Sequence, residues 1–317
     1  MATSPRFELA DVAALGDRLR TNVGRAVKAV DEVVQDVLVA LLAEGHVLVE
    51  DHPGVGKTAL ARAFARSIDA EYARIQGTAD LLPADVVGTS IFNQREARFE
   101  FRPGPVFANI VLVDEINRAS PKTQSGLLEC MQERRVTVDV HTHEVARPFL
   151  VIATQNPLDY EGTYPLPEAQ LDRFMVRVSL GYPSAEQEAD MLAEHAAGDR
   201  VLDLAPVCSL NEVLGAQEAV TRVHASEALR RYVVAILERT RADERVELGA
   251  SPRAGLMLLR AAKAAAALDS RDHALPDDVQ ALAPAVLSHR LLLAPEAMSA
   301  NGAVTVVRDA VARVPAL

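Results

Sequence analysis

The 317-residue sequence has few cysteines and no long apolar run. Its two cysteines, Cys130 and Cys208, stand alone without C-x-x-C spacing, so we expect buried thiols in a reducing compartment rather than a disulfide framework or a zinc cluster. No stretch reaches the ~18 uninterrupted apolar residues of a membrane span, and residues 1–15 show no apolar run behind a basic cluster. We therefore expect a cytoplasmic protein with no membrane span and no signal peptide.

Basic residues are also in deficit. The chain has 33 Lys+Arg against 44 Asp+Glu, a net charge of −11. Residues 184–317 hold 14 Lys+Arg and 19 Asp+Glu, a balance of −5, which leaves −6 for residues 1–183. Because neither half is basic, a generally phosphate-binding surface is excluded and nucleic acid is not an expected partner.

Short apolar stretches alternate with amphipathic ones in the first half of the chain. A helix is predicted over 11–42, another opens at Lys57, and helical segments separate most of the predicted strands. The strands are predicted at 46–50, 72–76, 110–114, 149–154 and 174–180. Such an alternation predicts an α/β fold with a parallel sheet that is covered on both faces.

Strand patterns end near Tyr182 and helical patterns follow. At ~150 residues per domain, the length itself predicts two domains. We expect an α/β domain over 1–183 and an all-helical domain over 184–317. The predicted helices of the second domain include 225–239, 252–268 and 276–293.

A glycine-rich segment follows the first predicted strand. Residues 51–58, Asp-His-Pro-Gly-Val-Gly-Lys-Thr, match the phosphate-loop pattern except at its first glycine, where Asp51 stands. Lys57 would reach the β/γ-phosphate oxygens of a nucleotide and Thr58 would ligate Mg²⁺, while backbone N–H groups surround the phosphates. A turn that only links strand to helix is the alternative. The predicted cofactor-binding residues of this loop are His52, Pro53, Gly54, Val55, Gly56, Lys57 and Thr58.

Two carboxylates end the third predicted strand. Asp114 and Glu115 follow the apolar residues 110–113, and ligands of open α/β sheets bind at the carboxyl ends of strands. Asp114 is predicted to hold Mg²⁺ through water, and Glu115 to polarise the attacking water. The alternative is that the pair caps the next helix, but Ser120-Pro121 already provides a start signal for that helix.

The fourth predicted strand leads into Gln155-Asn156-Pro157 at the same sheet edge. The amide of Asn156 is suited to orienting the attacking water. An asparagine before a proline is equally a turn residue, so both interpretations stay open.

Together these stretches resemble the AAA+ ATPases, and specifically the MoxR family, over about residues 25–289. The most specific matches are residues 45–50 leading into the phosphate loop, Val-Asp-Glu-Ile-Asn-Arg-Ala at 113–119, and Ala-Thr-Gln-Asn-Pro at 153–157. The longest unbroken match is Glu-Gly-Thr-Tyr-Pro-Leu-Pro-Glu-Ala-Gln-Leu-Asp-Arg-Phe at 161–174. The chain departs from the family at 28–31, where Lys-Ala-Val-Asp replaces the usual Val-Gly-Gln step beside the adenine base.

The resemblance implies a role for each matching residue. Arg173 would be the arginine finger that reaches the γ-phosphate bound by the neighbouring subunit, and Arg253 would be sensor 2 on a helical lid. The alternatives are a salt bridge from Arg173 to Glu168 or Asp172, and an ordinary exposed helix-start arginine at position 253. The remaining implied roles are Walker A for Lys57 and Thr58, Walker B for Asp114 and Glu115, and sensor 1 for Asn156.

Beyond the residues, the resemblance implies an AAA+ P-loop core with a C-terminal helical lid and ATP and Mg²⁺ as cofactors. It also implies a homo-oligomer that forms a hexameric ring. The expected role is that of a chaperone-like remodelling, maturation or metal-insertion factor for a client complex, often beside a von Willebrand factor A domain protein. A magnesium-chelatase-like motor subunit and a DNA-handling AAA+ motor are the alternatives.

Two hairpin inserts are predicted within the first domain, at about 88–104 and about 135–148. In the first, Phe99 and Phe101 would share one face, either buried against the sheet or carried on an insert that projects toward a central pore. In the second, His141 and His143 are two residues apart, and we interpret them as a solvated turn rather than a metal site.

Overall fold

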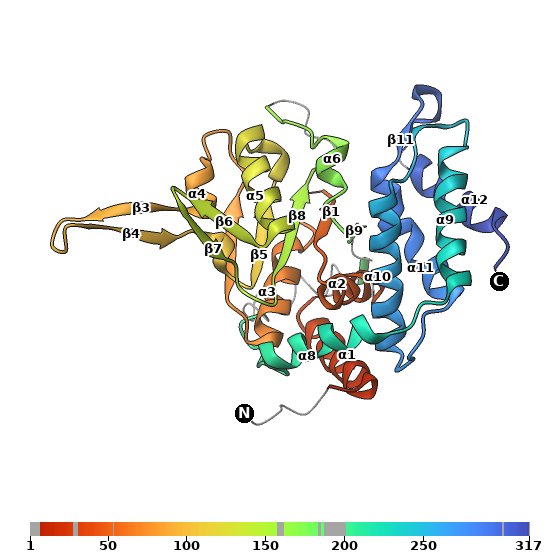
Figure 1. Ribbon diagram of the computed structural model, residues 1–317, viewed down its shortest axis with the longest axis horizontal. Helices are drawn as coiled ribbons and strands as arrows, with labels where there is room; N and C mark the ends of the chain where they lie inside the picture. The colour runs from red at the N-terminus through yellow and green to blue at the C-terminus, as the bar shows by residue number, and fades with distance from the viewer. Residues whose placement is uncertain are drawn as a thin grey trace.

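The computed structural model describes residues 7–27, 31–52, 54–156, 162–182, 185–186, 201–299 and 301–316. Over these residues an α/β core is followed by a helical region, and the two lie side by side in Figure 1. The predicted domain boundary at 183–184 lies outside the described residues. No helix in the described ranges is both long enough and apolar enough to cross a bilayer.

The core contains a five-stranded sheet with the order β2-β5-β8-β1-β9, and every neighbouring pair is parallel. This confirms the predicted α/β fold with a parallel sheet. Because all five strands run in the same direction, their carboxyl ends lie along one edge of the sheet. The strands are β1 (Val47–Glu50), β2 (Tyr72–Gln76), β5 (Ile110–Asp114), β8 (Leu150–Gln155) and β9 (Val176–Val178).

Helices cover both faces of the sheet. Alternate strand residues point to opposite sides, and the residues on both sides are apolar and pack against helices. On one face lie α1 (Leu9–Gly24), α2 (Asp31–Leu42) and α3 (Lys57–Ile68); on the other lie α4 (Pro83–Val87) and α5 (Pro121–Glu133). The strand residues packed with α1–α3 are Val47, Val49, Ile110, Leu112, Leu150, Ile152, Val176 and Val178. The residues packed with α4 and α5 are Leu48, Ile75, Val111, Val113, Val151 and Ala153.

The helical region shares the hydrophobic core of α1–α3. Helix α1 approaches α10 so closely that a Cβ on Gly16 would lie 2.3 Å from Leu268 Cδ2, so a side chain larger than hydrogen at this position would push the helices apart. The lid is therefore packed against the core over a continuous apolar surface. Its helices are α8 (Leu210–Arg222), α9 (Glu227–Arg241), α10 (Pro252–Leu268), α11 (Pro276–Leu287) and α12 (Gly302–Arg313).

Both predicted hairpins form, as β3 (Gly88–Asn93) with β4 (Arg98–Pro103), and β6 (Arg135–Val138) with β7 (His141–Glu144). The β3–β4 hairpin projects well beyond the body of the molecule (Figure 1). The Phe99 side chain near its tip is 73% exposed, so the alternative in which it is buried against the sheet is wrong. Phe101 instead stacks on the His143 ring with centroids 3.9 Å apart, which joins the two hairpins at their bases.

Three predicted bounds and the prediction of an all-helical second domain were wrong. The helix predicted over 11–42 is two helices, because α1 ends at Gly24, a poor helix former, and residues 25–26 form a turn. The helix predicted over 276–293 ends at Leu287 and continues as the 3₁₀ turn η3 (Ser288–Arg290). The helical region also contains a two-stranded antiparallel sheet of β10 (Val246–Leu248) and β11 (Leu292–Leu293). The strand predicted over 174–180 is confined to β9.

Candidate functional site

The glycine-rich segment connects β1 to the N-terminus of α3 at the carboxyl edge of the sheet. Gly54 and Gly56 have φ values of +86° and +96°, a backbone conformation that L side chains rarely adopt. A Cβ added at either position would meet no atom within 4 Å, so the conformation and not crowding requires glycine there. The space beside both glycines is therefore open, and a glycine-rich loop before a helix N-terminus suits a phosphate group.

Lys57 and Thr58 begin α3, where the helix presents its unpaired N–H groups. The Lys57 ammonium donates a hydrogen bond to the main-chain oxygen of Asp51 at 2.8 Å, which keeps its side chain folded across the loop. Val55 packs against the core, and His52 is partly buried. Pro53, which the sequence places in this loop, lies outside the described residues.

The two carboxylates predicted for Walker B lie at the end of β5. Thr154, near the end of β8, contacts both residues: its hydroxyl donates to the Asp114 carboxylate at Oδ1, at 2.7 Å, and accepts from the main-chain N–H of Glu115 at 2.9 Å. Because Val49 of β1 is the register partner of Thr154, this network lies one strand away from the start of the phosphate loop. The sheet thus brings the loop and the acidic pair to the same edge.

Glu115 has a left-handed backbone conformation, with φ +55°, which is strained for a residue with a side chain. Its carboxylate accepts hydrogen bonds from Gln76 Nε2 at 3.2 Å and from Arg118 Nη1 at 3.3 Å. The alternative in which the acidic pair caps the next helix is wrong, because Ser120 caps α5 by accepting from the Thr123 N–H at 3.3 Å.

Sequence reasoning missed three residues of this site. Thr154 was hidden inside an apolar strand, and Arg74 and Gln76 lie on β2, which was treated only as sheet. Arg74 Nη2 contacts Asp114 Oδ2 at 2.7 Å, so the carboxylate of Asp114 is held from both sides. The missed signal was the polar alternation of β2, in which residues 74 and 76 share one face at the sheet edge.

Asn156 follows β8 directly and so lies at the same edge as the phosphate loop and the acidic pair. Its neighbour Gln155 donates a hydrogen bond to Glu50, the last residue of β1. Glu50 also accepts from Arg177 of β9 at 2.8 Å, and Arg177 donates to Ser288 Oγ of the helical region at 3.0 Å.

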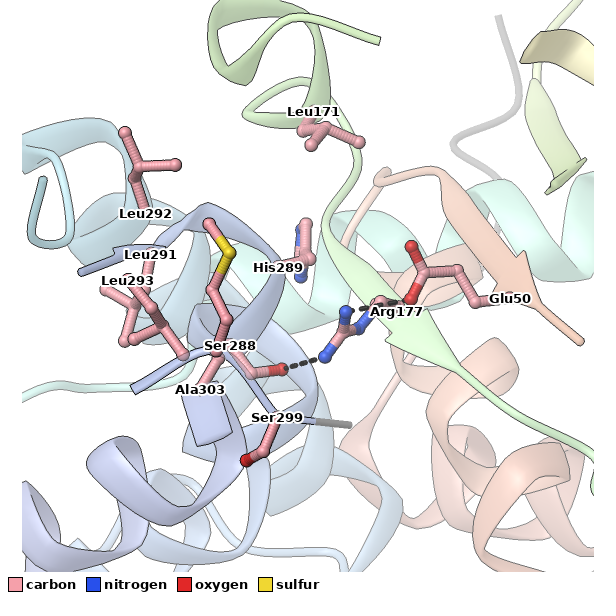
Figure 2. A pocket seen from close by; sticks show the side chains of 11 residues that line it. Glu50, Leu171, Arg177, Ser288, His289, Leu291, Leu292, Leu293, Ser299 and Ala303 are labelled. Atoms are coloured by element: carbon pink, nitrogen blue, oxygen red, sulfur yellow. Dashed lines mark hydrogen bonds and ion pairs between the residues drawn. The ribbon is translucent and has the colours of Figure 1, made fainter. Parts of the chain in front are cut away.

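Figure 2 shows the Arg177 guanidinium between Glu50 and Ser288, beside a cavity of about 490 Å³ at the junction of core and lid. The junction is thus bridged by charged and polar groups that start one residue before the phosphate loop. A movement of the lid against the core would have to break the hydrogen bonds of Arg177 to Glu50 or to Ser288, or move these residues together.

Arg173 follows the short helix α6 (Glu168–Leu171) and does not line the junction cavity. Within the described ranges, no hydrogen bond or ion pair joins Arg173 to Glu168 or Asp172, and the buried Arg173 Nε has no hydrogen-bond partner there. The side chain instead borders a separate polar cavity of about 480 Å³ whose other lining residues come from α5 and the β6–β7 hairpin. They are Glu129, Gln132, Glu133, Arg135, Thr137 and Thr142.

Asp172 has a different partner from the one that sequence reasoning considered. Its carboxylate accepts from Arg290 Nε at 2.8 Å and from Ser251 Oγ at 3.2 Å. Arg290 is almost fully buried, and burial is the main cause that lowers the pKa of its guanidinium, with the Asp172 carboxylate acting in the opposite direction. The segment that carries Arg173 is therefore fastened to the lid of its own chain.

Arg253 is the second residue of α10, after Ser251 as the N-cap and Pro252. It is partly buried rather than fully exposed, and its positive charge contributes to the lowered pKa of Arg290. Because Ser251, two residues before Arg253, donates to the Asp172 carboxylate at 3.2 Å, the start of α10 lies against the segment that carries Arg173.

The described residues contain no cluster of three or more His, Cys, Asp or Glu side chains that is placed to hold a metal ion alone. The two cysteines are buried and unpaired, as predicted. Lys28, Ala29 and Val30, where the chain departs from the family beside the adenine base, lie outside the described residues.

Comparison with known proteins agrees with this geometry. The sequence model of the "ATPase family associated with various cellular activities (AAA)" matches residues 46–176, and that of the "AAA lid domain" matches residues 238–310. The chain is 50% identical over 291 residues to YeaC of Bacillus subtilis, covering 90% of this chain and 91% of YeaC. It is 42% identical over 292 residues to "Chaperone MoxR1" of Mycobacterium tuberculosis, covering 89% of this chain and 77% of that protein.

Among solved structures, the fold is similar to a putative ATPase from Cytophaga hutchinsonii, with a TM-score of 0.87 and 35% identity. The match covers 97% of both chains, so it includes the sheet, the lid and their relative arrangement. Sequence, sheet order and lid thus lead to the same conclusion. The chain belongs to the MoxR family of AAA+ ATPases.

Proposed function

We propose that this protein hydrolyses ATP with Mg²⁺ at a site completed by a neighbouring copy of the chain, within a hexameric ring. The observation that carries the proposal is the meeting of the phosphate loop and the Asp114–Thr154–Glu115 network at one sheet edge. An open loop for phosphates beside a braced pair of carboxylates is the arrangement that phosphoryl transfer to water requires.

The donor atoms at this edge fit a magnesium ion. Thr58 offers a hydroxyl and Asp114 a carboxylate, and hard oxygen donors of this kind are what Mg²⁺ prefers beside the phosphates of a substrate. When bound, Mg²⁺ would neutralise charge on the β- and γ-phosphate oxygens. The role of Asp114 is to hold its carboxylate toward that position, and Thr154 and Arg74 brace it there.

Glu115 is the proposed general base for the attacking water. Its left-handed backbone turns the side chain out of the strand direction, and Gln76 and Arg118 hold its carboxylate. Asn156, at the end of the neighbouring strand, is the proposed orienting group for the same water. Lys57 would exchange its bond to the Asp51 carbonyl for the phosphate oxygens of ATP.

Arg173 is the proposed arginine finger for the neighbouring subunit. Arg173 borders a cavity to which the described residues of the phosphate loop contribute nothing, and its buried Nε has no hydrogen-bond partner among the described residues, which supports a role outside its own site. A head-to-tail contact that brings Arg173 to the next phosphate loop closes into a ring if the rotation permits. Arg253 is the proposed sensor 2, which would contact the nucleotide from the lid.

The proposed biological role is chaperone-like remodelling, maturation or metal insertion for a client complex, together with a von Willebrand factor A domain protein. The relative named "Chaperone MoxR1" supports the chaperone part of this role. The projecting β3–β4 hairpin, with Phe99 exposed near its tip, supplies an apolar surface suited to a client chain. Two buried, unpaired cysteines support a cytoplasmic location.

The variant Glu115→Gln tests this proposal. It keeps the size of the side chain and removes its basicity, so we expect ATP binding to persist while phosphate release stops. Glu238→Gln, an exposed position on α9, is the matched control and should turn over like the parent chain. Undiminished phosphate release from Glu115→Gln would remove Glu115 as the base.

A further inference from the structure

Asp51 stands where the phosphate-loop pattern has its first glycine. A carboxylate here would repel the phosphates of a nucleotide if it faced the loop, and would be costly to bury without donors. The side chain is only 5% exposed. The carboxylate must therefore find its hydrogen-bond donors inside the protein. Those donors indicate what an aspartate does at a position where the general motif has glycine.

The donors come from the residues that follow β9. Asp51 Oδ2 accepts from the N–H of Leu180, from the N–H of Gly181 at 3.0 Å, and from Ser179 Oγ at 3.2 Å. Its other oxygen accepts from the His52 N–H at 3.2 Å. One carboxylate thus binds three consecutive residues of a segment about 130 positions away in the sequence.

The next residue of the loop makes a second contact with the same segment. The His52 ring stacks on the Tyr182 ring, with centroids 5.3 Å apart and planes 19° from parallel. Tyr182 is 75% exposed even with this stack in place. Two consecutive loop residues therefore hold four consecutive residues, 179–182.

Residues 179–182 directly follow the last strand of the sheet, β9. The ladder between β1 and β9 ends at the Val49–Val178 pair, so Asp51 continues the connection by side chain after the backbone pairing has stopped. Gly181 has φ +67°, where the chain turns away from the sheet. In the sequence, residues 179–182 stand between β9 and the first helix of the helical region, α8, so this segment belongs to the connection between core and lid.

The same loop residue also touches the catalytic lysine. The main-chain oxygen of Asp51 accepts a hydrogen bond from Lys57 Nζ at 2.8 Å, while its side chain binds residues 179–181. A phosphate that draws Lys57 away changes the contacts on one side of Asp51. A rotation of the lid changes the contacts on the other side.

We propose that Asp51 is a positioning residue that couples nucleotide in the phosphate loop to the orientation of the lid, with His52 and Tyr182 as a supporting contact. This rests on the proposed ATPase function and adds the route by which the site controls the lid. It also gives a role to Asp51, the residue that departs from the phosphate-loop pattern. Asp51→Gly, which restores the glycine of the general motif, should therefore impair the protein.

The experiment measures the lid directly by fluorescence energy transfer in the full-length chain. Lys122→Cys on α5 and Arg308→Cys on α12 supply exposed labelling sites on core and lid. Burial raises the pKa values of Cys130 and Cys208 to about 12, so the native thiols should react slowly. Saturating Mg-ATP is added in the Glu115→Gln background, with Asp51→Gly, Asp51→Asn or the buried lid control Asp278→Asn.

The proposal predicts an ATP-dependent change in transfer for the parent and for Asp278→Asn. The ATP-dependent change is lost in Asp51→Gly and reduced in Asp51→Asn, which keeps one acceptor oxygen. In both Asp51 variants the affinity for ATP falls by less than about fivefold. In a chain that keeps Glu115, Asp51→Gly should lower the rate of phosphate release by about tenfold or more. If Asp51→Gly does not fold, Asp51→Asn alone carries the comparison.

Three results would overturn the proposal: an unchanged ATP response in the Asp51 variants, loss of ATP binding itself, or no ATP response in the parent. The test stays separate from the proposed catalytic role of Glu115. If Glu115→Gln still hydrolyses ATP, the assignment of the base fails, and the Asp51 comparison is repeated with a slowly hydrolysed ATP analogue.

Discussion

Thr154 offers a sharp test of the proposed catalytic edge, because its one hydroxyl connects β8 both to the carboxylate of Asp114 and to the main-chain N–H of Glu115. The side chain is fully buried, and valine has nearly the same shape without the hydroxyl. Thr154→Val therefore removes two hydrogen bonds, the one donated to Asp114 Oδ1 and the one accepted from the Glu115 N–H, and creates little cavity.

The magnitude follows from these two bonds. A hydrogen bond to a charged group contributes roughly 1.5–3 kcal/mol, and a buried N–H without a partner costs roughly 1–3 kcal/mol. We therefore expect the free energy of unfolding to fall by about 3 kcal/mol. If about 1.4 kcal/mol of this lost stabilisation is also lost from the transition state of ATP hydrolysis, the rate of hydrolysis falls about tenfold.

The assays are urea unfolding and steady-state phosphate release at saturating Mg-ATP. Thr154→Ser keeps the hydroxyl and should retain most of the activity. Thr123→Val is the matched control, because Thr123 is also buried and donates to the Leu81 carbonyl at 2.7 Å. It should lose stability but not turnover. Parent-level kcat in folded Thr154→Val would refute the reasoning.

Two further predictions concern stability. Burial, with a contribution from Arg134 and Arg260, lowers the pKa of His46 from 6.5 to about 4. The unfolded chain therefore binds a proton that the folded chain does not, and the free energy of unfolding should fall by up to about 3 kcal/mol as the pH drops from 6.5 to 4. His46→Gln should lack this component when urea unfolding of the two chains is compared across that range, and parallel pH profiles would contradict the assignment. Arg290→Met strands the Asp172 carboxylate and should cost about 3 kcal/mol or more; a double-mutant cycle with Asp172→Asn should be strongly non-additive, and simple additivity would show that the pair is not coupled.

Much of the fold could be predicted because its strands are strongly patterned. Strands at 72–76 and 110–114 have the predicted bounds, and α10 has the bounds predicted for it, since Ser251 and Pro252 mark its start. Boundaries failed where tertiary contacts decide them. The helix expected to reach residue 293 ends at Leu287, where Arg290 binds the main-chain oxygens of Phe174 and Met175 instead of continuing the helix.

The candidate site shows the same division. Motif spacing predicted roles for Lys57, Asp114 and Glu115, because each lies in a short contiguous motif, and these roles stay predictions. It did not identify Thr154 or Arg74, whose roles depend on which strand lies beside which. The order of strands in the sheet is set by pairing between segments far apart in the sequence. The role of a polar residue within an apolar strand can therefore be predicted only when the neighbouring strand is known.

The central claim is that one subunit's phosphate loop and the next subunit's Arg173 form a shared site. It is tested most directly by mixing Lys57→Ala chains with Arg173→Ala chains and measuring phosphate release. Neither variant should hydrolyse ATP alone, while mixed rings contain interfaces that pair an intact loop with an intact finger and should recover part of the activity. Absence of recovery in every mixture, with co-assembly verified, would contradict the shared site.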